Sequence, residues 1–443
     1  DLYSKADLIK NGAGAVPIKT VHFVYDYSLC PGTPNSNNGG KLTLKEVYFT
    51  YGNNTEGSLN SYKFSYSGFN PSYNHNRYDR WGYYKYNSSG MPSNEDFPYT
   101  LQDSAKTDLF SAAWNLTDID LPSGGHIQVN YESNDYAYVQ NQRAAQMFLI
   151  DGVSHTPGGT ITESLYTNAS SYNDWINITL PHPETSKTAF YNDYLAGVDE
   201  NGSKLYFRFL IDIDGKGDYE SVPGYADIDG SNYQSTTEAS HWAIKIQDVS
   251  TGAHSVASAN PMALSSWQFV RLNLPQDAYP GSQTSGGVLG VIESLLGIMT
   301  SVSQIFEGFD GWCVQHGFGK RFKADHSYVR LNNPNYKKYG GGTRVKEIDI
   351  SDNWSSMVNN LQSSFTYGQT YNYTTALGNR TISSGVATYE PIAGGDENAC
   401  RQPLPYEEKY LCAPNNKMYT ETPLGESLYP GAGVVYSKVT VTN

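Results

Sequence analysis

TSGGVLGVIESLLGIMTSVSQIFEGFDGWCVQHG, residues 284–317, is the stretch that differs most from the rest of the chain. Its apolar residues recur in steps of three and four, which traces one face of a helix. They are Val288, Val291, Ile292, Leu295, Met299, Val302, Ile305, Phe306 and Phe309. Small and polar residues, among them Glu293 and Glu307, occupy the opposite face. The pattern predicts one long amphipathic helix near residues 286–316.

This apolar face has to pack on a sheet, on a partner or on a membrane. Residues 288–309 approach the about 20 residues that span a bilayer. A spanning helix would, however, bury Glu293 at a cost of about 3 kcal/mol. An interfacial helix usually carries Lys or Arg on its polar face, and this segment has neither before Lys320. We therefore interpret residues 284–326 as a helical brace or plug against a sheet, and we do not expect membrane insertion.

The composition of the chain is typical of β-sheets. Of the 443 residues, 37 are tyrosine and 42 are glycine, and only 17% are charged. Tyrosine favours strands and covers sheet faces while its hydroxyl stays in water. We therefore expect a mainly β fold, with irregular antiparallel hairpins that form a shell or a multi-sheet scaffold. The net charge of −14 excludes nucleic acid as a partner, because phosphate binding requires a basic surface.

Alternating apolar and polar residues predict strands along most of the chain. The clearest lie at 18–27, 41–51, 62–66, 206–213, 241–246 and 343–350. Residues 125–131 are expected either to pair with residues 136–139 across a turn at 132–135, or to lead onward to residues 145–150. Pro261 is expected to start a helix that ends at Leu274. No repeat with a period of 20–50 residues supports a propeller or a solenoid.

We divide the chain into four consecutive regions. They are hairpins over 1–100, a β-rich region with short helices over 101–283, the helical brace over 284–326, and a β-rich region over 327–443. The sequence opens at Asp1 without a hydrophobic signal and stops in the strand-like residues 439–443. We therefore expect a piece of a longer polypeptide.

The four cysteines show no CxxC metal motif. An even cysteine count in a chain rich in Asn, Gly and Tyr favours an exported protein, in which disulfides persist. Cys400 and Cys412 flank a proline-rich loop and are the expected pair. Cys30 and Cys313 either form a second disulfide, which would join the helix to the first strands, or are two buried thiols.

The first region resembles a known family. KLTLKEVYFTYG (41–52), YKFSYSGFN (62–70) and YDRWGYYK (78–85) resemble the strand pairs of Rhs/YD-repeat proteins and of the Tc-toxin B component. Other segments are similar to very large, poorly characterised secreted or surface proteins of Bacteroidota. They include LPSGGHIQVNYESNDYAYVQNQRA (121–144) and SSGVATYEPIAGGDENACRQPLPY (383–406).

The resemblance implies a β-sheet spiral or shell, which in Rhs and Tc proteins encloses a toxic C-terminal cargo. It also implies an extracellular or bacterial cell-surface location, reached by type IX secretion. The partners would be other segments of the same long polypeptide or the secretion machinery. Neither the Rhs autoprotease signature nor a type IX sorting domain is recognisable in this sequence.

Asp212, Asp214, Asp218 and Glu220 are the candidate metal ligands. They lie in DIDGKGDYE (212–220), where alternate carboxylates and glycines in a tight loop can gather around Ca²⁺. The segment lacks the twelve-residue EF-hand spacing, and a polar hairpin turn also needs Asp and Gly. Calcium is thus the one cofactor that the sequence suggests, and a simple turn is the alternative.

Trp81, Tyr84 and Tyr86 are the candidate ligand-binding residues. Alternation along a strand would place Tyr84 and Tyr86 on one face, where their rings could stack on a sugar. The alternative is an aromatic cross-strand ladder that stabilises a sheet.

No catalytic residue is predicted from motifs. The sequence contains no G-x-S-x-G and no HExxH pattern. The glycines of Gly340–Arg344 (GGGTR) lack the form of a phosphate-binding loop. We expect them to permit close backbone approach at a bend before the strand at 345–350.

These observations favour a non-enzymatic, β-rich structural or shell segment of a giant exported bacterial surface or toxin-carrier protein. The first alternative is a glycan-binding adhesin module, with or without calcium. The second is a carbohydrate-active hydrolase, for which two suitably spaced carboxylates among the 44 acidic residues would suffice.

Overall fold

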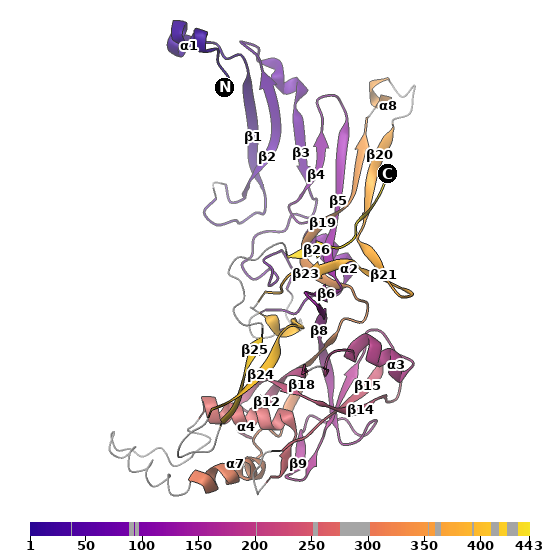
Figure 1. The fold of residues 1–443 in the computed structure, drawn as a ribbon. Coiled ribbons are helices and arrows are strands. Elements are labelled where there is room, and N and C mark those ends of the chain that lie inside the picture. Colours follow the sequence, from indigo (N-terminus) through magenta and orange to yellow (C-terminus); the bar gives the residue numbers. More distant parts are fainter. Residues whose placement is uncertain are drawn as a thin grey trace, which may run out of the picture.

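The computed structural model describes residues 1–36, 38–87, 93, 97–200, 202–250, 256–274, 302–352, 354–358, 365–391, 394–408, 416–422 and 433–443. Two lobes, each built on one large antiparallel sheet, are joined by a narrower waist (Figure 1). The expected mainly β class is confirmed.

The first lobe is an eight-stranded sheet in which neighbours pair antiparallel. Its strands, in order across the sheet, are β1 (Thr20–Leu29), β2 (Lys41–Thr50), β3 (Tyr62–Tyr66), β4 (Leu116–Asp120), β5 (His126–Tyr136), β19 (Lys338–Ser351), β20 (Thr366–Asn372) and β27 (Thr440–Thr442). The short helices beside it are α1 (Lys5–Asn11), η1 (Gly12–Gly14), η2 (Glu56–Asn60), α2 (Ser104–Ser111) and α8 (Trp354–Met357).

One face of this sheet is apolar across seven of its strands. Residues directly opposite each other share a face, since side chains alternate along each strand. The registered row that we call the apolar face is Phe23, Val47, Tyr62, Phe64, Ile119, Ile127, Ile350 and Tyr367. Each of these side chains is half-buried or exposed. In the described part of the chain the sheet stands as a single layer above the waist (Figure 1).

The second lobe is a seven-stranded sheet with helices against it. In order across the sheet, its strands are β13 (Tyr219–Ala226), β12 (Leu205–Asp212), β18 (Phe322–Asn332), β8 (Ala145–Ser154), β11 (Trp175–Thr179), β15 (His241–Ile246) and β14 (Ile228–Ser235). Its helices are α3 (Lys187–Phe190), the π-helix η3 (Tyr191–Leu195), α4 (Pro261–Asn273) and α7 (Val302–His316). Two small ladders flank it, β9 (Tyr166–Asn168) with β10 (Ser171–Tyr172), and β16 (Val249–Ser250) with β17 (Ser258–Ala259).

The main hydrophobic core lies in this second lobe. Phe207, Phe209 and Ile211 alternate along β12 and point into it, together with Trp267 of α4 and Phe309 of α7. Asn260 caps α4 by accepting a hydrogen bond from the Met262 amide, and Pro261 follows at its first turn. The helix predicted from Pro261 is therefore confirmed.

The predicted amphipathic helix is confirmed in its last part. α7 begins at Val302 and ends at His316, and Phe309 and Cys313 are buried in the core of the second lobe. This part packs beside α4 in that core. Residues 284–301 of the predicted helix lie outside the described residues.

The waist lies where the chain crosses between the lobes. It contains a four-stranded sheet, in the order β26 (Val434–Tyr436), β23 (Gly385–Ala387), β6 (Tyr138–Val139) and β7 (Gln142–Arg143). Beside it lie the hairpin of β21 (Thr374–Leu377) with β22 (Arg380–Ser383) and the turn η4 (Gly395–Glu397). The hairpin of β24 (Gln402–Glu408) with β25 (Asn416–Thr422) contacts β13 of the second lobe, where Tyr225 OH donates to Glu421 Oε1 at 2.7 Å.

The lobes do not follow the four consecutive regions expected from the sequence. The first lobe combines β1–β5 with β19, β20 and β27, so both halves of the chain build one sheet. The second lobe is inserted between them, over β8–β18. The chain passes through the waist after β5 and returns between β18 and β19 (Figure 1).

The hairpin expected from residues 125–131 and 136–139 is wrong. β5 continues without a turn through residues 132–135 and pairs with β4 and β19. The polar residues that suggested a turn are held in the strand by partners about 200 residues later in the chain, as described below.

Three glycines form the bend predicted at residues 340–342. β19 bulges between Tyr339 and Thr343, and Gly340, Gly341 and Gly342 have φ values of 142°, 82° and 103°. A Cβ on Gly341 would lie 2.7 Å from Val434 Cγ2. Positive φ and close approach therefore both require glycine at position 341.

Gly341→Ala is expected to lower the free energy of unfolding by about 2–4 kcal/mol, because it adds a steric overlap to left-handed strain. Gly378→Ala is the matched control. Gly378 has a φ of 58°, and a Cβ added there would meet no atom within 4 Å, so about 1 kcal/mol is expected. Urea denaturation measures both values. Equal losses would contradict the close approach at Gly341.

Candidate functional site

The waist contains the densest group of buried charges in the described residues. Neighbouring side chains on a strand point to opposite faces, so Asp135 and Tyr136 of β5 face opposite sides of the ladder with β19. Lys338 pairs with Tyr136 in that ladder. Two polar clusters result, one around Arg344 and one around Glu390.

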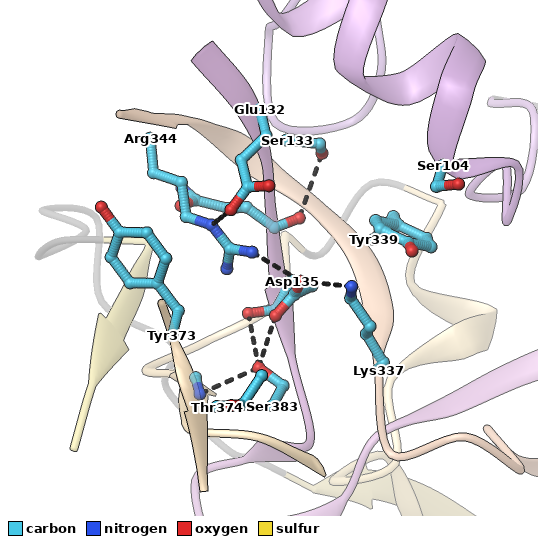
Figure 2. Close-up of polar contacts among 12 residues, drawn as sticks. Ser104, Glu132, Ser133, Asp135, Lys337, Tyr339, Arg344, Tyr373, Thr374 and Ser383 are labelled. Carbon is cyan, nitrogen blue, oxygen red and sulfur yellow. Dashed lines mark hydrogen bonds and ion pairs between the residues drawn. The ribbon is translucent and has the colours of Figure 1, made fainter. Parts of the chain in front are cut away.

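Asp135 and Arg344 form the centre of the first cluster (Figure 2). Arg344 Nη2 donates to Asp135 Oδ2 at 2.8 Å, and Arg344 Nε donates to Glu132 Oε1 at 2.7 Å. Ser383 Oγ donates to Asp135 Oδ1 at 2.5 Å, and Lys337 Nζ lies 3.4 Å from Asp135 Oδ2. The Asp135 side chain is 2% exposed, so its charge depends on these partners.

Two tyrosines complete the Arg344 cluster. Tyr436 OH accepts from Arg344 Nη1 at 2.7 Å and donates to Asn134 Oδ1 at 2.8 Å. The guanidinium carbon lies 4.3 Å from the centre of the Tyr373 ring. Burial alone would lower the pKa of Arg344, but the hydrogen bond to Asp135 and its charge raise it above the ordinary value. Arg344 thus joins β5 and β19 to segments near the end of the chain.

The second cluster surrounds Glu390 on the other side of the ladder. Glu390 Oε2 accepts from Arg80 Nη2 at 2.5 Å, and Glu390 Oε1 accepts from Lys338 Nζ at 3.0 Å and from Tyr136 OH at 2.5 Å. Glu397 Oε2 lies 3.7 Å from Arg80 Nη2 and 3.9 Å from Lys338 Nζ. The charged side chains are at most 2% exposed. Two cations and two anions are therefore enclosed together.

The pKa values of these groups follow from burial and charge. Burial pushes the pKa of Glu390 upward, but Arg80, Lys338 and the Tyr136 hydrogen bond together bring it below the ordinary value. Burial lowers the pKa of Lys338, and Glu390 and Glu397 oppose that effect. The Glu390 carboxylate is therefore held ionised by its neighbours.

The turn η4, which contains Glu397 of the Glu390 cluster, also contacts the second lobe. Asp396 accepts from Tyr206 OH at 2.8 Å and from Tyr99 OH at 3.1 Å. Arg330 of β18 donates to the Asp396 carbonyl at 3.2 Å and to the Asn398 carbonyl at 2.8 Å. Segments from the first hundred residues, from β12 and β18, and from residues 390–398 therefore meet at one place.

The central charged groups of both clusters are buried and paired with one another. Glu390 and Glu397 resemble a catalytic carboxylate pair in composition, yet they are enclosed together with Arg80 and Lys338. A glycosidase needs its two carboxylates on either side of an accessible bond. Ser383, which bonds Asp135, is 3% exposed and equally out of reach of a substrate.

The proposed calcium ligands lie in the turn between β12 and β13. Arg321 donates to Asp212 Oδ2 from Nε at 3.0 Å and from Nη2 at 2.5 Å. Asp214 Oδ1 accepts from the Lys216 amide at 2.8 Å and from the Asp218 amide at 3.3 Å. Within the described ranges, no three His, Cys, Asp or Glu side chains are placed to share a metal ion. The amide hydrogen bonds to Asp214 are those of a hairpin turn, and calcium binding by Asp212, Asp214, Asp218 and Glu220 stays a prediction.

The aromatic candidates do not form one surface. Trp81 packs in the waist near Tyr136 and Tyr389. Tyr84 packs edge-on against Phe69, Phe110 and Trp114. Tyr86 is 45% exposed and lies under Arg77, with the guanidinium carbon 4.5 Å from its ring centre. The segment is not a regular strand, because only an isolated bridge joins Tyr78 to Tyr84, so the expected alternation is wrong.

The cysteines lie in different parts of the molecule. Cys30 directly follows β1 in the first lobe, whereas Cys313 lies in the core of the second, and both are buried free thiols. The disulfide between them is wrong and the alternative of two buried thiols is confirmed. Cys400 Sγ lies 3.5 Å from the Val139 carbonyl, and its predicted partner Cys412 lies outside the described residues.

Sequence reasoning missed the charged residues of both clusters. Arg80 and Glu390 are 310 positions apart, and Asp135 and Arg344 are 209 apart. No local spacing links such residues. One sequence signal could have indicated them: Arg80 and Arg344 are charged residues that lie within aromatic or glycine-rich segments.

Comparison with known protein families, with characterised proteins and with solved structures found no match. Among the described helices, none is both long and apolar enough to cross a bilayer.

Asp79, beside the Glu390 cluster, provides a pH-dependent test. Burial raises the pKa of Asp79 to about 6, although the amides of Tyr83 and Trp81 and the charges of Lys85 and Arg80 lower it. The folded protein therefore takes up this proton at a higher pH than the unfolded chain, and Asp79 costs stability at neutral pH. Asp79→Asn is expected to raise the free energy of unfolding by about 1–3 kcal/mol at about pH 7.5.

The same linkage makes the gain from Asp79→Asn shrink between about pH 6 and pH 4, because the wild-type folded state is then protonated. Urea denaturation at a series of pH values measures the difference between the two proteins. A difference that does not change with pH would contradict the raised pKa.

Proposed function

We propose that this chain is a non-enzymatic, β-rich structural segment of a large exported bacterial surface or toxin-carrier protein. Its role is to hold two sheets in a fixed relation, and its partners are other segments of the same polypeptide or the secretion machinery. An extracellular or cell-surface location is part of this proposal.

The observation that carries the proposal is that the charged side chains of the waist are buried and paired with one another. Asp135, Arg344, Arg80, Lys338 and Glu390 are engaged with one another inside the protein. Buried ion pairs of this kind contribute weakly to net stability and can specify a single geometry. A fixed geometry between two lobes is what a scaffold requires.

Catalysis is the outcome that would refute this proposal. The full chain should be incubated with a panel of chromogenic aryl glycosides and aryl esters, beside variants in which one carboxylate is changed to its amide. We expect no turnover that depends on any carboxylate. Turnover that disappears in a folded Asp→Asn or Glu→Gln variant would identify an enzyme.

One cavity favours the glycan-binding alternative. It has a volume of about 360 Å³, within the range of ligand pockets, and it is lined by Tyr191, Tyr233, Asp199 and Glu200 among others. Aromatic rings and carboxylates are the groups that bind sugar faces and hydroxyls. A glycan array tests this alternative with the full chain and Tyr191→Ala. Binding that is lost in Tyr191→Ala would establish it, and binding by neither protein would remove it.

A further inference from the structure

The apolar side chains on one face of the first lobe are more exposed than such side chains usually are. Phe23 on β1 is 55% exposed and Tyr367 on β20 is 64% exposed, at opposite ends of the row. Between them, Ile119, Ile127 and Ile350 are only half-buried. In the second lobe the comparable side chains of β11 and β12 are fully buried beneath helices. An antiparallel sheet usually packs its apolar face on another layer.

The opposite face of the same sheet is charged. Glu46 pairs with Lys63, which pairs with Asp120, and Asp118 and Asp349 flank Gln128. The sheet is therefore strongly two-sided, and its charges lie away from the apolar face. A chain with a net charge of −14 repels its own copies over most of its surface. The eight residues of the apolar face carry no charge, and the charge beside them at β1 is a cation, since Lys19 Nζ lies 3.9 Å from the ring centre of Phe49. Two copies can therefore approach there without bringing carboxylates together.

We propose that the apolar face binds the same face of a second copy of this chain, which forms a two-layer β-sandwich across a twofold axis. Such an interface is isologous, because the same residues contribute on both sides. Two packed sheets lie about 10 Å apart with strands about 30° from parallel, which lets side chains from the two faces interdigitate. This inference concerns assembly and does not depend on the proposed function.

The area of the face is close to the minimum for a specific dimer. Its seven strands at a spacing of about 4.8 Å span about 29 Å, and about five residues along each strand span about 17 Å. Each copy would then bury about 490 Å², or about 1,000 Å² in total, which is about the area that a biological interface needs. An area at the low end of this range favours a reversible dimer.

Sedimentation velocity on the full chain over a range of concentrations tests the proposal. The monomer has a mass of 49.0 kDa, and we expect a concentration-dependent species of twice that mass. Phe23→Glu and Tyr367→Glu should each weaken the dimer by about tenfold or more, because each would bury an unpaired carboxylate. Both side chains are exposed within one chain, so these variants should fold. Circular dichroism and the unfolding midpoint check this.

Thr370→Glu is the matched control. Thr370 is exposed on the same strand as Tyr367, but it pairs with Glu347 and so lies on the charged face. The Thr370→Glu substitution should leave the dissociation constant of the dimer unchanged. A chain that stays monomeric up to about 100 µM would overturn the proposal and indicate that another protein segment covers this face. A dimer that resists both Phe23→Glu and Tyr367→Glu, or that Thr370→Glu weakens equally, would also overturn it.

Discussion

Arg80→Met is expected to lower the free energy of unfolding by about 3–5 kcal/mol, which is the usual cost of leaving a buried charge without its partner. The substitution removes the 2.5 Å contact with Glu390 and the 3.7 Å contact with Glu397, and leaves Lys338 to face both carboxylates. Methionine fills much of the same volume, so the loss reports on charge more than on packing.

The pH dependence of the Arg80→Met loss has a definite sign. The pKa of Glu390 lies below its ordinary value in the folded protein, so its contribution to stability is present above the unfolded pKa and disappears as the pH falls through the folded value. The difference between wild type and Arg80→Met should therefore be full at neutral pH and shrink in acid.

Urea denaturation measures the Arg80→Met effect, with Lys106→Met as the control. Lys106 pairs with Asp103 at 3.2 Å on the surface, where its side chain is 64% exposed, and such pairs contribute little. No measurable change is expected in Lys106→Met. A loss of less than about 1 kcal/mol in Arg80→Met would mean that the Glu390 cluster does not stabilise the waist.

Arg344→Met is expected to have the second largest effect, a loss of about 3 kcal/mol or more. Asp135 would keep its hydrogen bond from Ser383 and the longer contact to Lys337, whose side chain is 41% exposed, and Glu132 would lose its 2.7 Å partner. The Tyr436 hydroxyl would lose the donor at 2.7 Å and keep the Asp135 amide at 3.3 Å. The strands β5, β19 and β26 should therefore be held together less firmly.

Arg344→Lys is the matched variant for this prediction. Lysine keeps the charge but cannot contact Asp135, Glu132 and Tyr436 at once, because the planar guanidinium fork is lost. We expect a stability between those of wild type and Arg344→Met, measured by the same denaturation. Equal stability of Arg344→Lys and wild type would show that charge alone suffices and that the guanidinium geometry has no role.

The local features of this fold could be predicted from the sequence because their causes are local. Pro261 starts α4 since it lacks an amide hydrogen and lies just after the capping residue Asn260. The glycines at 340–342 form a bend because only glycine tolerates those φ values beside Val434. Phe309 packs in the core as the helical spacing required.

The sequence-based predictions that failed have a common physical cause, which is contact between residues far apart in the chain. Residues 132–135 contain Glu, Ser, Asn and Asp, and a polar run of this kind usually marks a turn. Here Asp135 is buried because Arg344 and Ser383 satisfy it, so β5 continues. The Glu390 cluster was missed for the same reason, since its members come together only in the folded chain.

The central claim is that the buried charges of the waist make the two lobes one cooperative unit. Scanning calorimetry of the wild-type chain and of Arg80→Met tests it most directly. We expect a single transition in the wild type, and two separated transitions in Arg80→Met, one for each sheet. Two transitions already present in the wild type, unchanged by the substitution, would contradict it.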